Sequence, residues 1–181
     1  MLLLIWSEIM ENYIPDIYQK SIYSINYDML TKRGIKCILF DLDNTLVPPN
    51  SKIPNKKLQE LFDELKNKFK IIIFSNSTNK RLKPFIEQLK IDGYSLVDKE
   101  FEIKIEDVMS KYSLNINEIA IVGDQLLTEI YLGNNVGITT IYVNPISKND
   151  AFKIKLSRFK EKRIMKKLRN KDLFLVGRYY E

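Results

Sequence analysis

Residues 35–46, IKCILFDLDNTL, decide how the rest of the chain is interpreted. The apolar run at 35–40 contains β-branched isoleucines, which predicts a buried β-strand that ends at Asp41. Asp43 follows two residues later, and two carboxylates this close repel each other unless a cation lies between them. Mg²⁺ suits this position because it prefers hard oxygen ligands, whereas a solvated loop with Asx turns is the alternative for an isolated Asp-X-Asp pair. The longer motif DLDNTL directly after an apolar strand favours the metal site over the solvated loop.

Short apolar runs alternate with amphipathic stretches along the chain. Further strands are expected at residues 70–74, near 94–97, at 118–122 and at 138–143. Helices are expected between them, at about residues 55–68, 80–90, 103–112 and 126–134. This alternation predicts an α/β fold, a Rossmann-like parallel sheet with right-handed crossovers and helices on both faces.

Polar residues stand at the ends of several predicted strands. Ser75 directly follows one strand, Asp124 follows another, and Lys99 lies two residues beyond a third. Because ligands bind outside the carboxyl ends of parallel strands, these side chains are expected to converge with Asp41. A helix N-cap is the alternative for Ser75, and an ordinary surface position is the alternative for any single lysine.

The composition narrows the chemistry. The chain has 181 residues, 45% of them apolar and 29% charged, which is typical of a globular domain with a real core. There is no histidine, so His-based general bases, triads and metal ligands are excluded. Cys37 is the only cysteine, which excludes a disulfide framework and indicates buried packing within the apolar run.

The positive charge is concentrated at the C-terminal end. The net charge is +6, and the segment from Ala151 to Lys171 holds ten Lys or Arg residues against Glu161 alone. Residues 1–150 are therefore expected to form the folded domain with an N-terminal extension, and residues 151–181 a basic helical segment packed on or next to it. Phe152, Leu156 and Phe159 fit one helical face. Ile164, Met165 and Leu168 are rotated away from it, which predicts a bend or break near Lys160.

Three roles are possible for this basic segment. A basic amphipathic helix can lie on an anionic membrane, with about 1 kcal/mol of attraction per Lys or Arg near the surface. A terminal helix docked on the core with a solvated basic face is the alternative, and contact with nucleic acid is less favoured. The apolar residues 2–6 are too few to span a bilayer. The expected location is cytoplasmic, with peripheral contact on the inner face of the membrane.

The string DLDNTL resembles the signature of the haloacid dehalogenase (HAD) superfamily of phosphatases. The resemblance implies that Asp41 is the nucleophile and forms an aspartyl-phosphate, which splits one hard step into two easier ones. It implies that Asp43 protonates the leaving alkoxide and then activates the hydrolytic water. It also implies a Mg²⁺ cofactor held by the carboxylates of Asp41 and Asp124 and the backbone carbonyl of Asp43.

The other HAD motifs are matched with two departures. Ser75, Asn76 and Lys99 form the implied phosphate-binding set, in which Lys99 neutralises the phosphate and the nucleophile. Relatives usually carry Lys-Pro at this point, whereas here Lys99 precedes Glu100, and Lys104 is the alternative lysine. The implied catalytic set is thus Asp41, Asp43, Ser75 and Lys99.

The fourth motif is VGDQLLTE, residues 122–129. Gly123 permits a tight turn from strand to helix, and Asp124 completes the metal site that the resemblance implies. Relatives usually have Asp at the last position, where this chain has Glu129, which is one methylene longer and is expected to shift the metal geometry.

Residues 123–134, GDQLLTEIYLGN, resemble the YqeG-like phosphatases, a group similar to mitochondrial and plastid phosphatidylglycerophosphate phosphatases. The resemblance runs from about Tyr13 to the basic C-terminal segment. Only 31 residues separate Asp43 from Ser75, and 23 separate Ser75 from Lys99, so neither interval has room for the cap domain of many HAD relatives. An open crevice suits a phosphate that is presented on something large.

The leading expectation is a Mg²⁺-dependent phosphomonoesterase that acts on a membrane-presented substrate such as phosphatidylglycerophosphate. One alternative is a phosphatase for a soluble nucleotide, sugar or phosphoprotein. Another is a weakly active or inactive HAD-fold module that binds RNA, a ribosome or a protein partner. The expected partners are thus a phosphorylated substrate and an anionic membrane lipid, with nucleic acid disfavoured and the oligomeric state left open.

Overall fold

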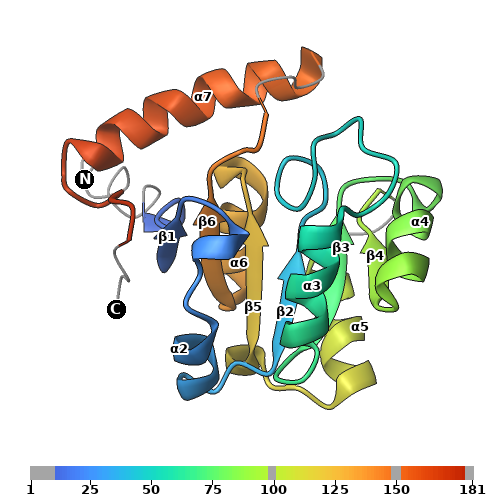
Figure 1. Cartoon of the computed structure of the whole chain (residues 1–181). Helices are drawn as coiled ribbons and strands as arrows, with labels where there is room; N and C mark the ends of the chain where they lie inside the picture. Colours follow the sequence, from blue (N-terminus) through green and yellow to red (C-terminus); the bar gives the residue numbers. More distant parts are fainter. Residues whose placement is uncertain (1–10, 98–100, 148–151, 178–181) are drawn as a thin grey trace.

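The computed structural model describes residues 11–97, 101–147 and 152–177, with side chains from residue 158 onward in the last range. The parallel sheet has the order β1-β6-β5-β2-β3-β4. Its strands are β1 (Ile17–Gln19), β2 (Cys37–Phe40), β3 (Lys70–Ser75), β4 (Asp92–Ser95), β5 (Ile119–Gly123) and β6 (Thr139–Val143). The helices are α2 (Tyr27–Lys32), α3 (Lys56–Leu65), α4 (Asn79–Leu89), α5 (Phe101–Tyr112), α6 (Tyr131–Val136) and α7 (Phe152–Arg169), with short helical turns η1 (Ile22–Ser24), η2 (Ile116–Glu118) and η3 (Leu126–Ile130). The predicted α/β parallel fold is confirmed (Figure 1).

The central strand β2 is buried on both faces. Ile38 and Phe40 belong to the apolar cluster that includes α3 and α4, whereas Cys37 and Leu39 belong to the cluster that includes α5. The four side chains are completely buried, as expected for an interior strand of a parallel sheet covered on both sides. The alternation along β2 is what places helices on both faces.

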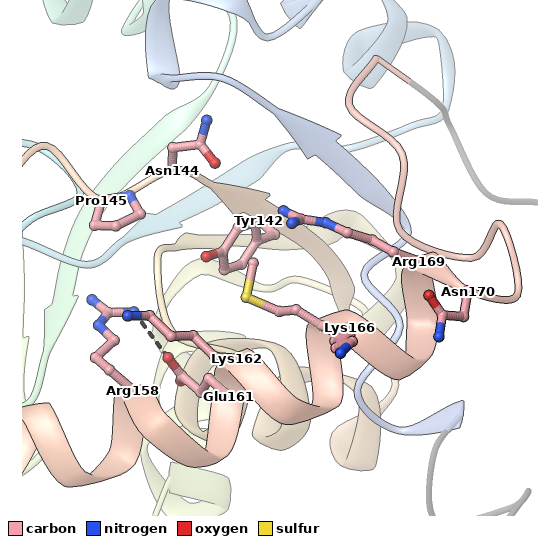
Figure 2. Close-up of a pocket in the computed structure, with 10 residues that line it drawn as sticks. Tyr142, Asn144, Pro145, Arg158, Glu161, Lys162, Lys166, Arg169 and Asn170 are labelled. Carbon is pink, nitrogen blue, oxygen red and sulfur yellow. Dashed lines mark hydrogen bonds and ion pairs between the residues drawn. The ribbon is translucent and has the colours of Figure 1, made fainter.

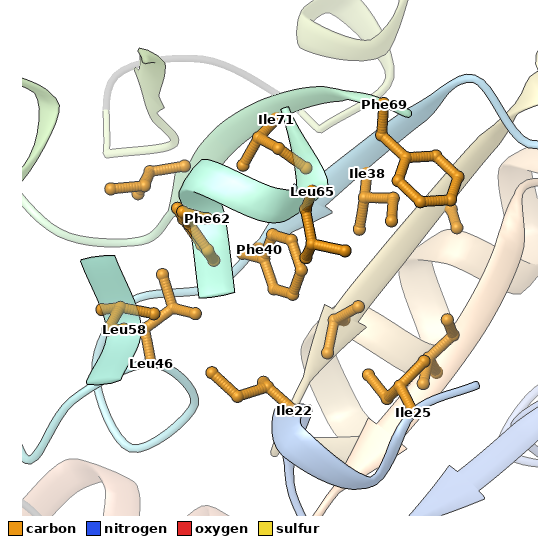
Figure 3. Packing of buried hydrophobic residues seen from close by; sticks show 14 of the residues in the cluster. Ile22, Ile25, Ile38, Phe40, Leu46, Leu58, Phe62, Leu65, Phe69 and Ile71 are labelled. Carbon is orange, nitrogen blue, oxygen red and sulfur yellow. The ribbon is translucent and has the colours of Figure 1, made fainter. Parts of the chain in front are cut away.

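Helix α3 shows how the first layer is fixed. Its N-cap Asn55 accepts a hydrogen bond from the backbone N–H of Leu58 at 2.9 Å, which satisfies one of the free donors of the first turn. Leu58, Phe62 and Leu65 then face the sheet, and the rings of Phe62 and Phe40 lie 5.1 Å apart (Figure 3). This packing anchors the strand that leads into the acidic loop.

Four details differ from the sequence-based expectation. The edge strand β1 was not predicted, and β4 begins at Asp92 rather than near residue 94. The helix expected at 126–134 is a π-helical turn, η3, followed by the short helix α6. Of the bend or break expected near Lys160, the break is wrong because α7 runs without interruption from Phe152 to Arg169.

Helix α7 crosses the end of the sheet toward which the strands point (Figure 1). A third apolar cluster holds it there through Leu168, with Phe174 from the segment that follows. These residues pack against Tyr18 of β1, Tyr142 of β6 and the turn η3. Of the three residues expected on one apolar face, Phe159 is 56% exposed, and the side chains of Phe152 and Leu156 lie outside the described part of the structure.

The intervals between β2 and β3 and between β3 and β4 each hold one α-helix among the described residues, α3 and α4. Neither interval contains a separate folded unit that could cover the ends of the strands. None of the described helices is long and apolar enough to cross a membrane.

Candidate active site

Asp41 lies at the end of β2 and is 4% exposed. Its backbone N–H donates to the carbonyl of Val122 on β5 at 3.0 Å, which fixes the start of the loop. Its Oδ1 accepts a hydrogen bond from Ser75 Oγ at 2.7 Å. Its Oδ2 is buried and has no hydrogen-bond partner among the described residues. Such an orphaned buried oxygen requires an explanation, because native proteins rarely leave one unsatisfied.

Asp124 follows β5 and is completely buried. Thr45 Oγ1 donates to its Oδ1 at 3.0 Å, and the guanidinium of Arg158 on α7 pairs with its Oδ2. Burial raises the pKa of Asp124 to about 6, although Arg158 opposes the shift. For Asp41, burial and then the charge of Asp124 raise the pKa to about 7, with the Ser75 hydrogen bond acting in the opposite direction. The two carboxylates therefore share one buried crevice.

The side chain of Asp43 has different partners from that of Asp41. Its carboxylate accepts from Ser77 Oγ at 2.7 Å and pairs with Arg81 Nη2 at 2.7 Å, and its side chain is 26% exposed. The Asp-X-Asp pair is thus split between a buried carboxylate and an accessible one. This difference suits a buried nucleophile beside an acid–base group that must exchange protons with water.

Asn44 fixes the loop between these groups and the following helix. Its φ of 71° lies in the left-handed region, which Asn tolerates better than most residues. Its N–H donates to the carbonyl of Val47 at 2.8 Å, and its Oδ1 accepts from the Oγ of Ser147 at 3.0 Å. The acidic loop is therefore held to the segment that follows β6.

Glu129 lies behind the two aspartates and is 6% exposed. Its Oε2 accepts hydrogen bonds from Thr128 Oγ1 at 2.8 Å and from the backbone N–H of Gln125 at 3.2 Å. Burial, and then the charges of Asp41 and Asp124, raise its pKa well above the usual value. It is thus close enough to the two carboxylates to interact with them electrostatically.

The donor set fits a divalent cation. No group of three His, Cys, Asp or Glu side chains is arranged for a metal within the part of the chain that the structure describes. The expected site needs only two carboxylates, however, because its third protein ligand is the backbone carbonyl of Asp43. The orphaned Oδ2 of Asp41 offers a free ligand atom, and a cation there would relieve the repulsion by Asp124 that adds to the effect of burial on the pKa of Asp41.

The phosphate-binding residues are only partly placed. Ser75 is buried beside Asp41, whereas Asn76 directly after it is exposed. Lys99 lies outside the described residues. The Nζ of Lys104 is 5.3 Å from the ring of Tyr94 and 4.0 Å from Asp107, so this side chain lies against the edge strand β4.

Two arginines were not predicted from the sequence. Arg81 holds Asp43 from the first turn of α4, and Arg158 holds Asp124 from α7. Both act across long sequence separations, which spacing does not reveal. One signal in the sequence could have indicated Arg158: Glu161 lies three residues after it, in a segment with no other acid. In the structure the two side chains form an ion pair at 3.1 Å.

Comparison with known proteins agrees with this geometry. Residues 7–147 match the family model described as mitochondrial PGP phosphatase. The Bacillus subtilis (strain 168) protein named "Probable phosphatase YqeG" is 34% identical over 160 residues, which cover 88% of this chain and 93% of that protein. Phosphatidylglycerophosphate phosphatase 1 of Arabidopsis thaliana is 27% identical over 182 residues, which cover 92% of this chain but only 48% of that longer protein.

The fold has relatives among solved structures. A HAD family enzyme of Bacteroides thetaiotaomicron, solved as a magnesium complex, superposes with a TM-score of 0.50 at 12% identity. The match covers 64% of this chain and 96% of that one, and at this identity it bears on the fold alone. The residues at the ends of β2, β3 and β5 and the family match together lead to one conclusion: the chain belongs to the mitochondrial PGP phosphatase family and is a phosphatase of the HAD type.

Proposed function

We propose that this phosphatase removes the terminal phosphate of a glycerophospholipid presented by a membrane, with phosphatidylglycerophosphate as the substrate and Mg²⁺ as the cofactor. The observation that carries the proposal is the orphaned, buried Oδ2 of Asp41 beside Asp124. It supplies both a free nucleophilic oxygen and a reason for a cation at the same place.

The reaction follows from the placement of the side chains. An oxygen of Asp41 attacks phosphorus, the bond to the ester oxygen breaks, and the phosphoryl group remains on Asp41 as an aspartyl-phosphate. Asp43 gives its proton to the departing alkoxide and then removes a proton from the water that releases inorganic phosphate. Bound Mg²⁺ supplies positive charge to the phosphoryl oxygens during transfer. Ser75 orients Asp41 through its 2.7 Å hydrogen bond.

Exposed apolar residues support a membrane-presented substrate. Ile53 lies in the loop before α3 and is 56% exposed, and Ile146 follows β6 and is 48% exposed. Both segments lie at the carboxyl end of the parallel strands, where the crevice opens. Phe159 on the basic helix α7 is also 56% exposed. Apolar side chains next to Lys and Arg are typical of surfaces that lie in the headgroup region of a membrane.

The test compares the wild type with Asp41→Asn on phosphatidylglycerophosphate in vesicles and on soluble phosphomonoesters. The wild type is expected to act faster on the lipid, in a manner that depends on Mg²⁺. Asp41→Asn should lose at least about a thousandfold in kcat, since it removes the nucleophile and keeps the shape. Lipid turnover no faster than soluble turnover would contradict the lipid proposal. Activity on no phosphoester at all would favour a binding module.

Membrane contact is tested separately by vesicle sedimentation. The double variant Ile53→Ser/Phe159→Ser is expected to bind vesicles of anionic lipid less well and to keep its rate on a soluble ester. Ile103→Ser is the matched control, because Ile103 is 43% exposed but lies on α5, which packs in a different apolar cluster from α3. Equal losses in the test and control variants would contradict the proposed contact surface.

A further inference from the structure

A cavity of about 590 Å³ lies between α7 and the end of β6, beside the active site. Its size is within the range of small-molecule sites. In Figure 2 the side chains of Arg158 and Arg169 reach from α7 toward Tyr142, which forms part of the opposite wall with Asn144 and Pro145. Arg158 also pairs with Asp124, so the cavity and the catalytic crevice share a wall.

The helical wall of the cavity carries a row of cations: Arg158, Lys162, Lys166 and Arg169. Their spacing of four, four and three residues places them along one face of α7. At a rise of 1.5 Å per residue the row extends about 16 Å away from Asp124. A ligand held in the crevice can therefore continue along this row.

Arg158 is neutralised by Asp124 and Glu161, whereas two lysines of the row, Lys162 and Lys166, have no acidic partner among the described residues. Among the described residues, Glu161 is the only acid that lines the cavity. Its buried carboxylate accepts from Arg158 at 3.1 Å and from the backbone N–H of Leu127 at 3.2 Å. Lys162 and Lys166 form no ion pair with any of the residues that the structure describes. Met165 and Pro145 add apolar surface beside these cations. The cavity thus has the chemistry to bind an anion that is attached to an organic group.

We propose that this cavity binds a second phosphate ester of the substrate, a phosphodiester joined through a short polyol to the phosphomonoester that Asp41 attacks. The inference rests on the proposed function and adds the feature that selects the lipid. Lys162 lies about 6 Å along the helix from Arg158, which is comparable with the span of a glycerol bridge. Lys and Arg form charge-assisted hydrogen bonds with phosphate oxygens. A lipid that has only a monoester, such as phosphatidic acid, would leave the cavity unfilled.

The test measures a ratio of two kcat/KM values. Phosphatidylglycerophosphate and phosphatidic acid with the same acyl chains are compared in vesicles of a neutral lipid. The wild type is expected to prefer the substrate that has the diester. The variant Lys162→Met/Lys166→Met should lower this preference by about tenfold for each cation that contacts the diester, on the scale of a charge-assisted hydrogen bond. A folding defect would lower both values and leave the ratio unchanged.

Lys160→Met is the matched control. Lys160 is an exposed cation on the same helix and does not line the cavity. Its loss weakens attraction to any anionic substrate equally, so the ratio should stay at the wild-type value. A double variant with an unchanged ratio, or a control with the same loss, would overturn the assignment of the cavity.

Two further measurements separate the possible sources of the diester and the two proposals. With short-chain substrates below their micelle concentration, the preference should persist, whereas its disappearance would assign the cavity to a neighbouring lipid and overturn the proposal. sn-Glycero-3-phosphoglycerol, which carries only the diester, should inhibit the wild type more strongly than the double variant. If the wild type prefers the diester lipid but the double variant does too, the cavity proposal fails and the function stands. The wild type could instead hydrolyse none of these lipids yet bind the soluble diester through Lys162 and Lys166. That result would contradict the proposed activity and support the assignment of the cavity as a diester site.

Discussion

The carboxylate of Asp41 has two oxygens in different surroundings, one bonded to Ser75 and one orphaned. The pKa of this group is raised to about 7, mainly by burial and then by Asp124. In the metal-free protein the native state therefore holds its proton more tightly than the unfolded chain, whose Asp has a pKa near 3.9. By linkage, the free energy of unfolding falls as the pH rises from about 4 to about 7.

The measurement is thermal unfolding in a chelator between pH 5 and pH 8. The chain has no histidine, so no imidazole titrates in this range. We expect a loss of about 2–3 kcal/mol across the window and a flatter profile for Asp41→Asn. Mg²⁺ should stabilise the wild type more at pH 8 than at pH 5, because a cation competes with protons for the carboxylates. The same slope in wild type and variant would contradict the assignment to Asp41.

Gly123 is required by its neighbour Glu129. A Cβ at position 123 would lie 2.3 Å from Glu129 Cγ and 2.6 Å from its Cβ. Gly123→Ala is therefore expected to cost about 1–3 kcal/mol, the usual range for overpacking. In a double-mutant cycle with Glu129→Gly, which removes both the Cγ and the Cβ that oppose the new methyl group, most of this loss should be recovered. Additive losses in urea unfolding would show that the strain lies elsewhere.

At the scale of elements, helix α4 ends in an unfavourable conformation. Its C-cap Lys90 has φ 52° and ψ 52°, in the left-handed region, where a Cβ is strained. Lys90→Gly is expected to stabilise the protein by about 0.5–1 kcal/mol, although glycine also loosens the unfolded chain. Lys90→Ala keeps the Cβ and is the control. Equal midpoints for the two variants in urea unfolding would contradict this explanation.

Most elements were predictable because apolar runs report burial directly. Strands β2, β3, β5 and β6 each contain an uninterrupted run of three or more apolar residues, as expected for buried parallel strands. Strand β1 has only three residues, too few for a periodic signal, and β4 begins with Asp92 and Gly93, which are poor strand formers. These two edge strands depend on pairing with their neighbours β6 and β3.

The site was predictable to the same extent. Asp41 and Asp124 directly follow strands and Ser75 is the last residue of one, so topology alone brings them together. Arg158 reaches Asp124 only because α7 is continuous and docks on the sheet, and tertiary packing of Leu168 decided this rather than the local pattern. The periodicity did not show which apolar residues of α7 dock on the sheet, because the basic segment has apolar residues on more than one side: Leu168 is buried and Phe159 is exposed.

At the scale of the molecule, α7 and the sheet share an apolar cluster and should unfold together. Leu168 is fully buried, so Leu168→Ala is expected to destabilise the protein by about 2–5 kcal/mol. Phe159→Ala on the same helix is the control and should change stability by less than about 0.5 kcal/mol, since its side chain is largely exposed. Calorimetry and far-UV circular dichroism should each give one transition. A separate early transition in Leu168→Ala alone would mean that α7 unfolds by itself.

The order of the strands also constrains how the chain can be made. The central strand β2 pairs with β3 close behind it, but its other neighbour is β5, where Cys37 lies opposite Ile119. Strand β1 lacks its partner for longer still, because Ile17 pairs with Ile141 of β6. During synthesis on a ribosome, Asp41 therefore has no completed surroundings until the segment that carries Asp124 has emerged. Until then, the nascent chain has unpaired strand edges. Chaperones that shield such edges would act before β5 has been synthesised.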